Sequence, residues 1–237
     1  MSGHFCVKLQ GLRKVYGERV VLDIDNLGFE AGRSYALVGP NGSGKSTLLR
    51  VLSGVIPASG GTIDVEGDVL RDDVRVGYMP QKSYTFGFSV ARNVALALDG
   101  MKLSKSEIAA RVEQALRDVG MWEMADARGS GLSGGEAQRV ALARLLVRDL
   151  DVVLLDEPTA SMDIAGTLLA EETLARYRER TGCLTIMATH APSQAHRISH
   201  DAVMLAAGRV VEKGPTDQVL SRPTSEAGRE FLSYWAV

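Results

Sequence analysis

Cysteine and long apolar runs are both scarce in this sequence. Its two cysteines, Cys6 and Cys183, lie far apart and lack the close spacing of metal ligands. We therefore expect no disulfide framework, and we expect a reduced, cytosolic setting. No run of about 18 apolar residues occurs, so we expect no membrane span in this chain. Work at a membrane would require another chain to hold this one there.

The sequence also lacks an excess of either charge. Its formal net charge is −2, and its basic residues are scattered. We therefore expect neither nucleic acid nor an anionic membrane surface as a partner. The densest basic patch, "RYRER" at residues 176–180, is interpreted as a solvated helix face. The opening "MSGHFCVKLQ" does not have the pattern of a secretory leader.

Apolar residues are abundant, at 45% of 237 residues, which suffices for one large domain. In the first thirty residues, glycines punctuate short β-like runs, which indicates an antiparallel sheet. Further along, four short apolar runs end in turn residues, as is typical of buried parallel strands covered by helices. These runs are "YALVG", "RVGYMP", "DVVLLDEP" and "CLTIMATH". The pattern predicts an α/β fold with a mainly parallel sheet.

A helical segment interrupts the predicted core. Between Gln81 and Ser133 the pattern is helical, and Ser104 and Glu107 have the spacing of a capping box. We predict a helical subdomain at residues 84–146, inserted into a single domain whose core comprises residues 1–83 and 147–237. A short helix is expected in "SRPTSEAGREFLSYWAV" at the end.

A glycine-rich stretch, "GPNGSGKST", follows the strand "YALV" and precedes the helical run "TLLRVLSGV". It has the form of a P-loop, in which backbone amides and a helix N-terminus face phosphate groups. Lys45 can reach the β- and γ-phosphates, and the Ser46 hydroxyl can bind Mg²⁺. A plain glycine turn with an exposed lysine is disfavoured, because strand and helix flank the motif as the mechanism requires. The predicted phosphate-binding residues are Gly39, Pro40, Asn41, Gly42, Ser43, Gly44, Lys45, Ser46 and Thr47.

Polar side chains follow three of the predicted core strands. Asp156 and Glu157 end "VVLLDE", where Asp156 can hold Mg²⁺ and Glu157 can polarise an attacking water. Gln81, after "GYMP", can bind Mg²⁺ or orient water through its amide. His190, after "IMAT", can hydrogen-bond a γ-phosphate as a neutral imidazole. Without the P-loop, Asp156 and Glu157 could equally be residues that merely end a strand, and Gln81 would be better interpreted as a surface residue. The other histidines, at positions 4, 196 and 200, are interpreted as surface or packing residues.

A second glycine pair opens the stretch "LSGGEAQRVALARLL". Ser133 and Glu136 have capping-box spacing, so the stretch predicts a helix. Gly134 and Gly135 disfavour a helix by about 1 kcal/mol each relative to alanine. They leave the amides of the first turn open to an anion, so both a cap and an anion site are expected.

In this order, the motifs resemble those of the ATP-binding cassette family, from "LRKVYGERVVL" to "AAGRVVEKG". The most specific of them is "LSGGEAQRVALARLL", which resembles the family's signature motif. The resemblance implies that Tyr16 stacks on adenine, that Asp163 in "SMD" belongs to the D-loop, and that Gln81 and His190 are the Q-loop and switch residues. No chemically critical position is substituted, which implies an active ATPase using ATP and Mg²⁺. Arg92 stands where many relatives carry an acidic residue.

The resemblance also implies partners. Ser133, Gly134 and Gly135 would cover the nucleotide of a second ATP-binding subunit, and we expect a second copy of this chain rather than a related subunit. Transmembrane permease subunits would dock near residues 81–98, so the chain would lie at the cytoplasmic face of the cell membrane. A solute-binding protein is the further expected partner, because stand-alone cassettes of this length resemble prokaryotic importer subunits.

Two other functions stay open at this point. The chain could be a soluble cassette ATPase acting in protein or cofactor assembly, or the ATPase of an exporter. A DNA-repair role is disfavoured, because the segment between Thr47 and Leu132 has no sustained heptads. The wording "YMPQKSY" and "DEPTASMD" weakly resembles that of oxyanion importers, with tungstate as the example, while amino acids and metals remain alternative solutes.

Overall fold

The computed structural model describes residues 5–67 and 74–233, so the interpretation of His4 lies outside the described residues. The chain divides into two compact units. The first comprises Met1–Tyr78, Asp151–Glu157 and Gly182–Val237, and the second comprises Met79–Leu150 and Pro158–Thr181. The subdomain boundary predicted at residues 84–146 stays a prediction.

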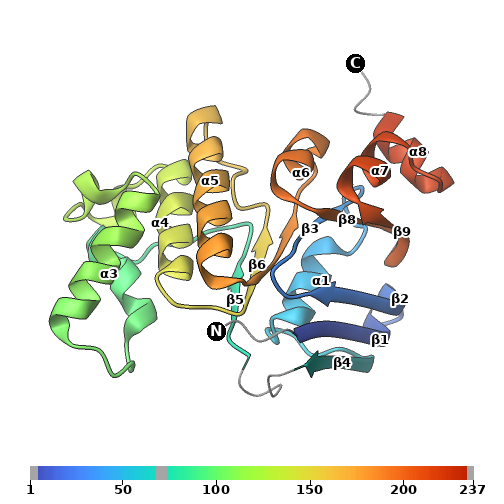
Figure 1. The fold of residues 1–237 in the computed structure, drawn as a ribbon, viewed down its shortest axis with the longest axis horizontal. Helices are drawn as coiled ribbons and strands as arrows, with labels where there is room; N and C mark the ends of the chain where they lie inside the picture. Colours follow the sequence, from blue (N-terminus) through green and yellow to red (C-terminus); the bar gives the residue numbers. More distant parts are fainter. Residues whose placement is uncertain (1–4, 68–73, 234–237) are drawn as a thin grey trace. The chain divides into compact units, whose positions relative to one another are not determined.

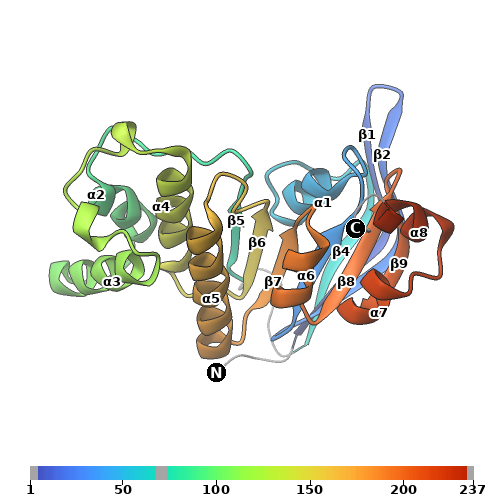
Figure 2. The ribbon, with the colours of Figure 1, turned by 90° about the horizontal axis from the view of Figure 1, so that it is seen from above.

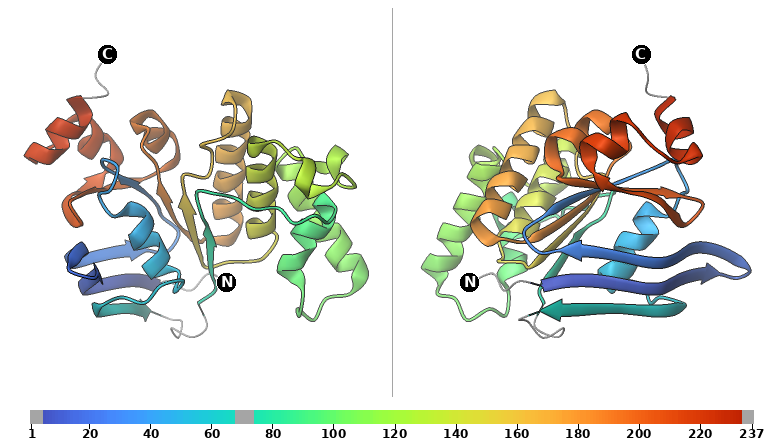
Figure 3. Two further views of the ribbon diagram at one scale, coloured as in Figure 1. Left: turned by 180° about the vertical axis from the view of Figure 1, so that it is seen from behind. Right: turned by 45° about the vertical axis from the view of Figure 1, so that its right-hand side comes forward.

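An antiparallel sheet opens the first unit, as the sequence predicts. It consists of β1 (Phe5–Tyr16), β2 (Arg19–Glu30) and β4 (Gly60–Gly67), in the order β2-β1-β4. Figure 3 shows these strands side by side. Gly17, at a φ of 58°, lies in the turn between β1 and β2, where left-handed backbone favours glycine. Apolar side chains of β1 alternate toward the core, as period-2 burial requires.

The main sheet of the first unit is built from the predicted apolar runs. In β3, β6 and β7 every residue is buried, which explains why these strands are continuous apolar runs. Strands β6, β7, β3 and β8 pair in parallel, and β9 pairs antiparallel with β8 (Figure 1). The full order is β5 (Val76–Met79), β6 (Val152–Asp156), β7 (Leu184–Ala188), β3 (Ser34–Val38), β8 (Asp201–Ala206) and β9 (Arg209–Pro215). The predicted α/β fold is confirmed.

The two faces of this sheet have separate cores. Tyr35 and Leu37 of β3 pack with helix α1 (Lys45–Leu52) and the antiparallel sheet in one apolar cluster. Ala36 and Val38, which alternate with them, pack into the cluster of α6, α7 and α8 on the other face. These three helices are Pro192–Ile198, Thr216–Ser221 and Glu226–Ser233, the last within the predicted terminal helix. The period-2 pattern thus places α1 and its loop against a rigid two-sided sheet.

The second unit is helical over most of its length (Figure 2). Its main helices are α2 (Val90–Ala95), α3 (Lys105–Asp118), α4 (Gly134–Leu146) and α5 (Ile164–Thr181). Short 3-10 turns at Leu96–Leu98, Trp122–Met124 and Gly129–Gly131 connect them. Both predicted capping boxes are confirmed, at Ser104 of α3 and Ser133 of α4.

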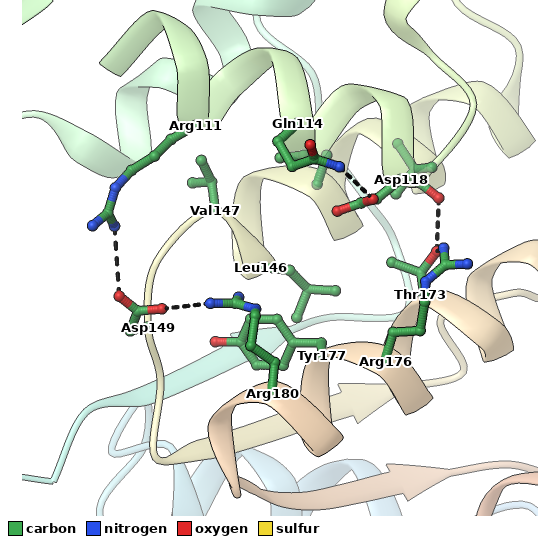
Figure 4. A pocket seen from close by; sticks show the side chains of 13 residues that line it. Arg111, Gln114, Asp118, Leu146, Val147, Asp149, Thr173, Arg176, Tyr177 and Arg180 are labelled. Atoms are coloured by element: carbon green, nitrogen blue, oxygen red, sulfur yellow. Dashed lines mark hydrogen bonds and ion pairs between the residues drawn. The ribbon is translucent and has the colours of Figure 1, made fainter. Parts of the chain in front are cut away.

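A groove of about 490 Å³ lies between α3, α4 and α5 of the second unit (Figure 4). Asp149 pairs there with Arg111 at 3.6 Å and with Arg180 at 3.1 Å. The Tyr177 hydroxyl donates to Arg148 O at 2.7 Å and accepts from Leu150 N at 2.8 Å. Asp149, in the segment that follows α4, therefore connects α3 and α5 through its two arginine partners. Within the described residues, no helix combines the length and apolarity that a membrane crossing requires.

Candidate nucleotide-binding site

The loop between β3 and α1 has a backbone that only glycine accommodates at two of its positions. Gly39 has a φ of 137°, and a Cβ there would lie 2.1 Å from Leu205 O. Gly44 has a φ of 108°, and its Cβ would lie 2.7 Å from the Leu22 side chain. Gly44 is also the N-cap of α1, where no side chain caps the first turn. The amides of this turn are therefore open to an anion.

Lys45 and Ser43 supply further donors inside this loop. Lys45 is buried, and its ammonium donates to Gly39 O at 2.7 Å and to Pro40 O at 3.0 Å. Burial lowers the pKa of Lys45, while the charges of Glu157 and Asp156 oppose that shift. The Ser43 hydroxyl is buried and has no hydrogen-bond partner among the described residues. A buried cation and an unpaired buried hydroxyl suit a loop that binds a multiply charged anion.

Asp156 is the last residue of β6 and is 2% exposed. The Ser46 hydroxyl donates to its Oδ1 at 2.9 Å, and the Tyr78 hydroxyl donates to its Oδ2 at 3.5 Å. Burial raises the pKa of Asp156, the Ser46 hydrogen bond opposes the shift, and the charge of Glu157 adds to it. A carboxylate and a hydroxyl side by side are the hard oxygen ligands that Mg²⁺ prefers, so Ser46 and Asp156 suit this ion.

Glu157 and His190 meet at the carboxyl edge of the main sheet. His190 Nδ1 lies 3.4 Å from Glu157 Oε2. Glu157 has a φ of 47°, which is unusual for a residue with a side chain, and its N–H donates to Ala188 O at 3.0 Å. Because β6 and β7 are neighbours, the residues that follow them lie together. The structure thus brings together two residues that the sequence places 33 positions apart.

Tyr16 is the last residue of β1 and is 49% exposed. The ammonium of Lys14 lies over the Tyr16 ring, 4.9 Å from its centroid. In the β1–β2 register, Lys14 is opposite Leu22, the residue against which Gly44 packs. The end of β1 is therefore one strand away from the phosphate loop.

The predicted signature stretch lies in the second unit. Ser133 is exposed and is the N-cap of α4, with its hydroxyl and amide both bonded to the Glu136 carboxylate. Gly134 is exposed, whereas a Cβ at Gly135 would lie 2.8 Å from Ser161 O. Gly135 therefore has a packing role that the sequence did not indicate. The Gln138 side chain accepts from Ser161 N at 2.8 Å and holds the same loop.

Gln81 and Asp163 also belong to the second unit. Gln81 is exposed and follows β5 by two residues. Asp163 is exposed, and its Oδ1 accepts from Gly166 N at 2.7 Å in the first turn of α5. Ile164 is 82% exposed, and Leu168 one turn later is 49% exposed. The first unit therefore gathers Lys45, Ser46, Asp156, Glu157 and His190, while Gln81, the signature residues and Asp163 are placed within the second.

Two residues at the site were missed from the sequence. Tyr78 reaches the carboxylate of Asp156, and Lys14 reaches the ring of Tyr16. Tyr78 stands in "GYMPQ" three residues before Gln81, but nothing in that motif indicates that its hydroxyl reaches a carboxylate. Lys14 stands two residues before Tyr16. Since residues two apart lie on the same face of a strand, the sequence could have predicted that these side chains are neighbours.

A glycine-rich loop between a parallel strand and a helix, with a buried aspartate ending another strand of the sheet, defines a P-loop nucleoside triphosphatase. The model of the ABC transporter family matches residues 22–160. The chain therefore belongs to the ATP-binding cassette family, as an ATP-binding subunit and an ATPase.

Known proteins of this family resemble the chain over most of its length. A phosphate import ATP-binding protein of Natronomonas pharaonis is 36% identical and aligns with 94% of this chain and 84% of its own. The ATP-binding protein of a tungstate uptake system of Peptoclostridium acidaminophilum is 37% identical, over 87% of this chain and 97% of its own. A dimeric ATP-binding cassette in a post-hydrolysis state, bound to ADP and Pi, superposes with a TM-score of 0.79 at 25% identity, over 89% of this chain and 98% of that one.

Proposed function

We propose that this chain is the ATP-hydrolysing subunit of a prokaryotic importer that carries a small oxyanion through separate membrane subunits. The observation that carries the proposal is the Glu157–His190 contact, which stands at the same sheet edge as Asp156 and its bond to Ser46. A nucleophile-activating carboxylate beside a phosphate loop is what ATP hydrolysis requires. The two curated relatives described above are subunits for phosphate and tungstate, which are tetrahedral oxyanions.

The phosphate loop would hold ATP through its backbone and two side chains. The uncapped amides of α1 and the ammonium of Lys45 would face the β- and γ-phosphates. The unpaired hydroxyl of Ser43 would donate to a phosphate oxygen. Tyr16, half exposed at the end of β1, would stack on the adenine ring. The remaining predicted contacts of the loop are those of Pro40, Asn41, Gly42 and Thr47.

Ser46 and Asp156 would hold Mg²⁺, with Gln81 as a further ligand from the second unit. When bound, the ion would neutralise charge on the β- and γ-phosphates. The Ser46 hydroxyl and the buried Asp156 carboxylate already lie 2.9 Å apart, which supports this assignment.

Glu157 would polarise the water that attacks the γ-phosphorus. As the new P–O bond forms, the bond from the γ-phosphorus to the bridging oxygen breaks, and ADP and inorganic phosphate leave. His190, whose Nδ1 lies beside Glu157, would hydrogen-bond the γ-phosphate as a neutral imidazole. The left-handed backbone at Glu157 supports a functional site, since such strain concentrates there.

A second copy of the chain would complete the site. Ser133, Gly134 and Gly135 would cover the γ-phosphate bound by the partner, and Asp163 would lie at the shared interface. The exposed start of α4, and the exposure of Ile164 and Leu168 beside Asp163, support this arrangement. ATP would then link the two copies, and its hydrolysis would release them.

The membrane subunits would dock on the second unit. Tyr84, Phe86 and Phe88 are each at least half exposed there, and Arg144 contacts two of them, donating to Tyr84 O at 2.8 Å and lying over the Phe86 ring. Exposed aromatic side chains are typical of a protein–protein interface. Docking to a permease would place the chain on the cytoplasmic face of the membrane, with a solute-binding protein on the other side.

Uptake measurements test this function. Cells lacking the chain should lose uptake of one of labelled phosphate, molybdate or tungstate, while amino-acid uptake continues. A tagged chain should copurify with a permease from membranes. Retained uptake of all three oxyanions would refute the solute class. Copurification with soluble proteins alone would favour the cofactor- or protein-assembly alternative, and loss of efflux would favour the exporter.

A further inference from the structure

Lys14 is a buried lysine that forms no ion pair with a carboxylate of the described residues. It is 9% exposed, and its ammonium donates to Pro57 O at 2.8 Å. The same ammonium lies over the Tyr16 ring at 4.9 Å from the centroid. Burying an ammonium is costly unless its donors are used, so this placement of a charge needs a reason.

The segment that binds Lys14 also binds the strand on either side of it. Ser59 N donates to Arg13 O at 2.7 Å, and Val15 N donates to Ser59 Oγ at 3.0 Å. Together with the bond from Lys14 to Pro57, three hydrogen bonds attach the end of β1 to residues 57–59. The backbone that carries Tyr16 is therefore fixed, while its ring stays half exposed.

This fixed strand end is connected to the phosphate loop. Lys14 is opposite Leu22 in the β1–β2 register, and Leu22 packs directly against Gly44. Gly44 in turn begins the helix that carries Lys45. A shift of the strand at Lys14 would therefore change the position of the Tyr16 ring relative to the phosphate loop.

The cation on the ring fixes which face of Tyr16 is available. A cation is attracted to the negative face of an aromatic ring. The Lys14 ammonium therefore favours the side-chain rotamer of Tyr16 that keeps the ring beneath it. Because the ring is half exposed, we expect a flat ligand to stack on its opposite face. Withdrawal of charge from the ring by the ammonium also suits stacking with an electron-rich purine.

We infer that Lys14 is a positioning residue for the nucleobase of ATP, acting through Tyr16, which it holds from behind by contact with the ring and a bond to Pro57 O. The inference rests on the proposed stacking of Tyr16 on adenine. It assigns to Lys14 a contribution to base binding and none to phosphate binding.

The test separates base binding from phosphate binding in the full-length chain. Equilibrium affinities for Mg-ATP and for Mg-triphosphate, which has no base, are measured for the wild type and for Lys14→Met. Methionine keeps the apolar stem and removes the charge. We expect ATP affinity to fall about two- to fivefold and triphosphate affinity to stay constant. Lys14→Arg, which keeps a cation above the ring, should restore ATP affinity.

Two comparisons make the assignment specific. Lys8→Met removes an exposed lysine of the same strand that pairs with Glu66, and it should leave both affinities unchanged. In a Tyr16→Ala background, Lys14→Met should have no further effect on ATP affinity, because the ring through which it acts is gone.

Each failure has its own signature. If Tyr16→Ala leaves ATP affinity intact, the proposed stacking is wrong. If Tyr16→Ala weakens ATP binding and Lys14→Met does not, stacking stands and the role of Lys14 is wrong. Equal loss of ATP and triphosphate affinity in Lys14→Met, with a lowered unfolding temperature, would assign Lys14 to the structure of the loop and overturn the inference.

Discussion

His190 Nδ1 and Glu157 Oε2 lie 3.4 Å apart, although the two residues follow different strands. The contact depends on the pairing of β6 with β7, whose register aligns Asp156 with Ala188. The next residue, Glu157, turns into left-handed backbone and donates its N–H to Ala188 O. Glu157 is therefore held through its N–H by Ala188 and at its carboxylate by the imidazole of His190. Two such contacts suit a base that must hold one orientation.

Replacing Glu157 tests this role. Glu157→Gln keeps the size of the side chain and removes its ability to take a proton. We expect ATP hydrolysis to fall about 10²- to 10⁴-fold while ATP binding persists. Without hydrolysis the ATP-bound dimer should accumulate and appear on gel filtration. Glu66→Gln, an exposed glutamate of β4, is the control, and hydrolysis by Glu157→Gln at the wild-type rate would show that another group is the base.

Glu212 gives a prediction on stability and pH. Thr224 N donates to its Oε1, and the Ser225 hydroxyl donates to its Oε2, each at 2.8 Å. Partial burial opposes ionisation, but these hydrogen bonds outweigh it and hold the pKa of Glu212 below its usual value. Because the folded chain favours the charged form, this stabilisation is present above the usual glutamate pKa and disappears as pH falls through the folded value.

Glu212→Gln should therefore lower the free energy of unfolding by about 1 kcal/mol at neutral pH. The difference from wild type should vanish in acid, where both side chains are neutral. Urea unfolding across this pH range measures it, with exposed Glu230→Gln as the control. A difference that persists unchanged in acid would mean that the charge of Glu212 is not what holds Thr224 and Ser225.

Gly135 gives a prediction on packing. An added Cβ would lie 2.8 Å from Ser161 O, a backbone atom that cannot rotate away. Alanine gains up to about 1 kcal/mol of helix propensity over glycine, but the overlap must be relieved by moving α4 or the 158–163 loop. We expect Gly135→Ala to destabilise the chain by about 1–3 kcal/mol.

Gly131→Ala is the matched control, since a Cβ there meets nothing within 4 Å. It should stay within about 0.5 kcal/mol of wild type in urea unfolding. If Gly135→Ala is as stable as Gly131→Ala, the close approach to Ser161 does not determine the residue at position 135, and anion binding would be the reason for glycine.

The sequence allowed local features to be predicted, and the structure explains why. The mostly apolar runs of β3, β6 and β7 and the two S-x-x-E caps are encoded within a few residues each, so they could be found without knowing the fold. Contacts that depend on strand order could not. Glu157 meets His190 only because β6 and β7 are neighbours, and Tyr78 reaches Asp156, 78 positions away, because β5 and β6 are neighbours.

The packing role of Gly135 was missed for the same reason. Both glycines of the signature stretch have an obvious local interpretation as openings for an anion, and nothing in the stretch indicates Ser161. Both positions face Ser161, but a Cβ at Gly134 would lie 3.3 Å from its side chain, whereas a Cβ at Gly135 would lie 2.8 Å from its backbone oxygen. An anion role for the pair therefore falls more on Gly134 and Ser133 than on Gly135.

Ser133 provides the decisive test of a shared site. Its side chain is exposed and its hydroxyl bonds Glu136 of the same helix, so we expect a bulky replacement to extend into solvent. Ser133→Arg should lose about 1 kcal/mol of helix capping and keep its fold. We expect it to abolish ATP hydrolysis while monomer affinity for ATP stays near wild type, because the arginine would block only the partner's nucleotide. Ser104→Arg removes the equivalent cap of α3 and should leave hydrolysis intact. Loss of monomer ATP binding in Ser133→Arg would place the signature residues in the site of their own chain and would remove the main reason to expect a dimer.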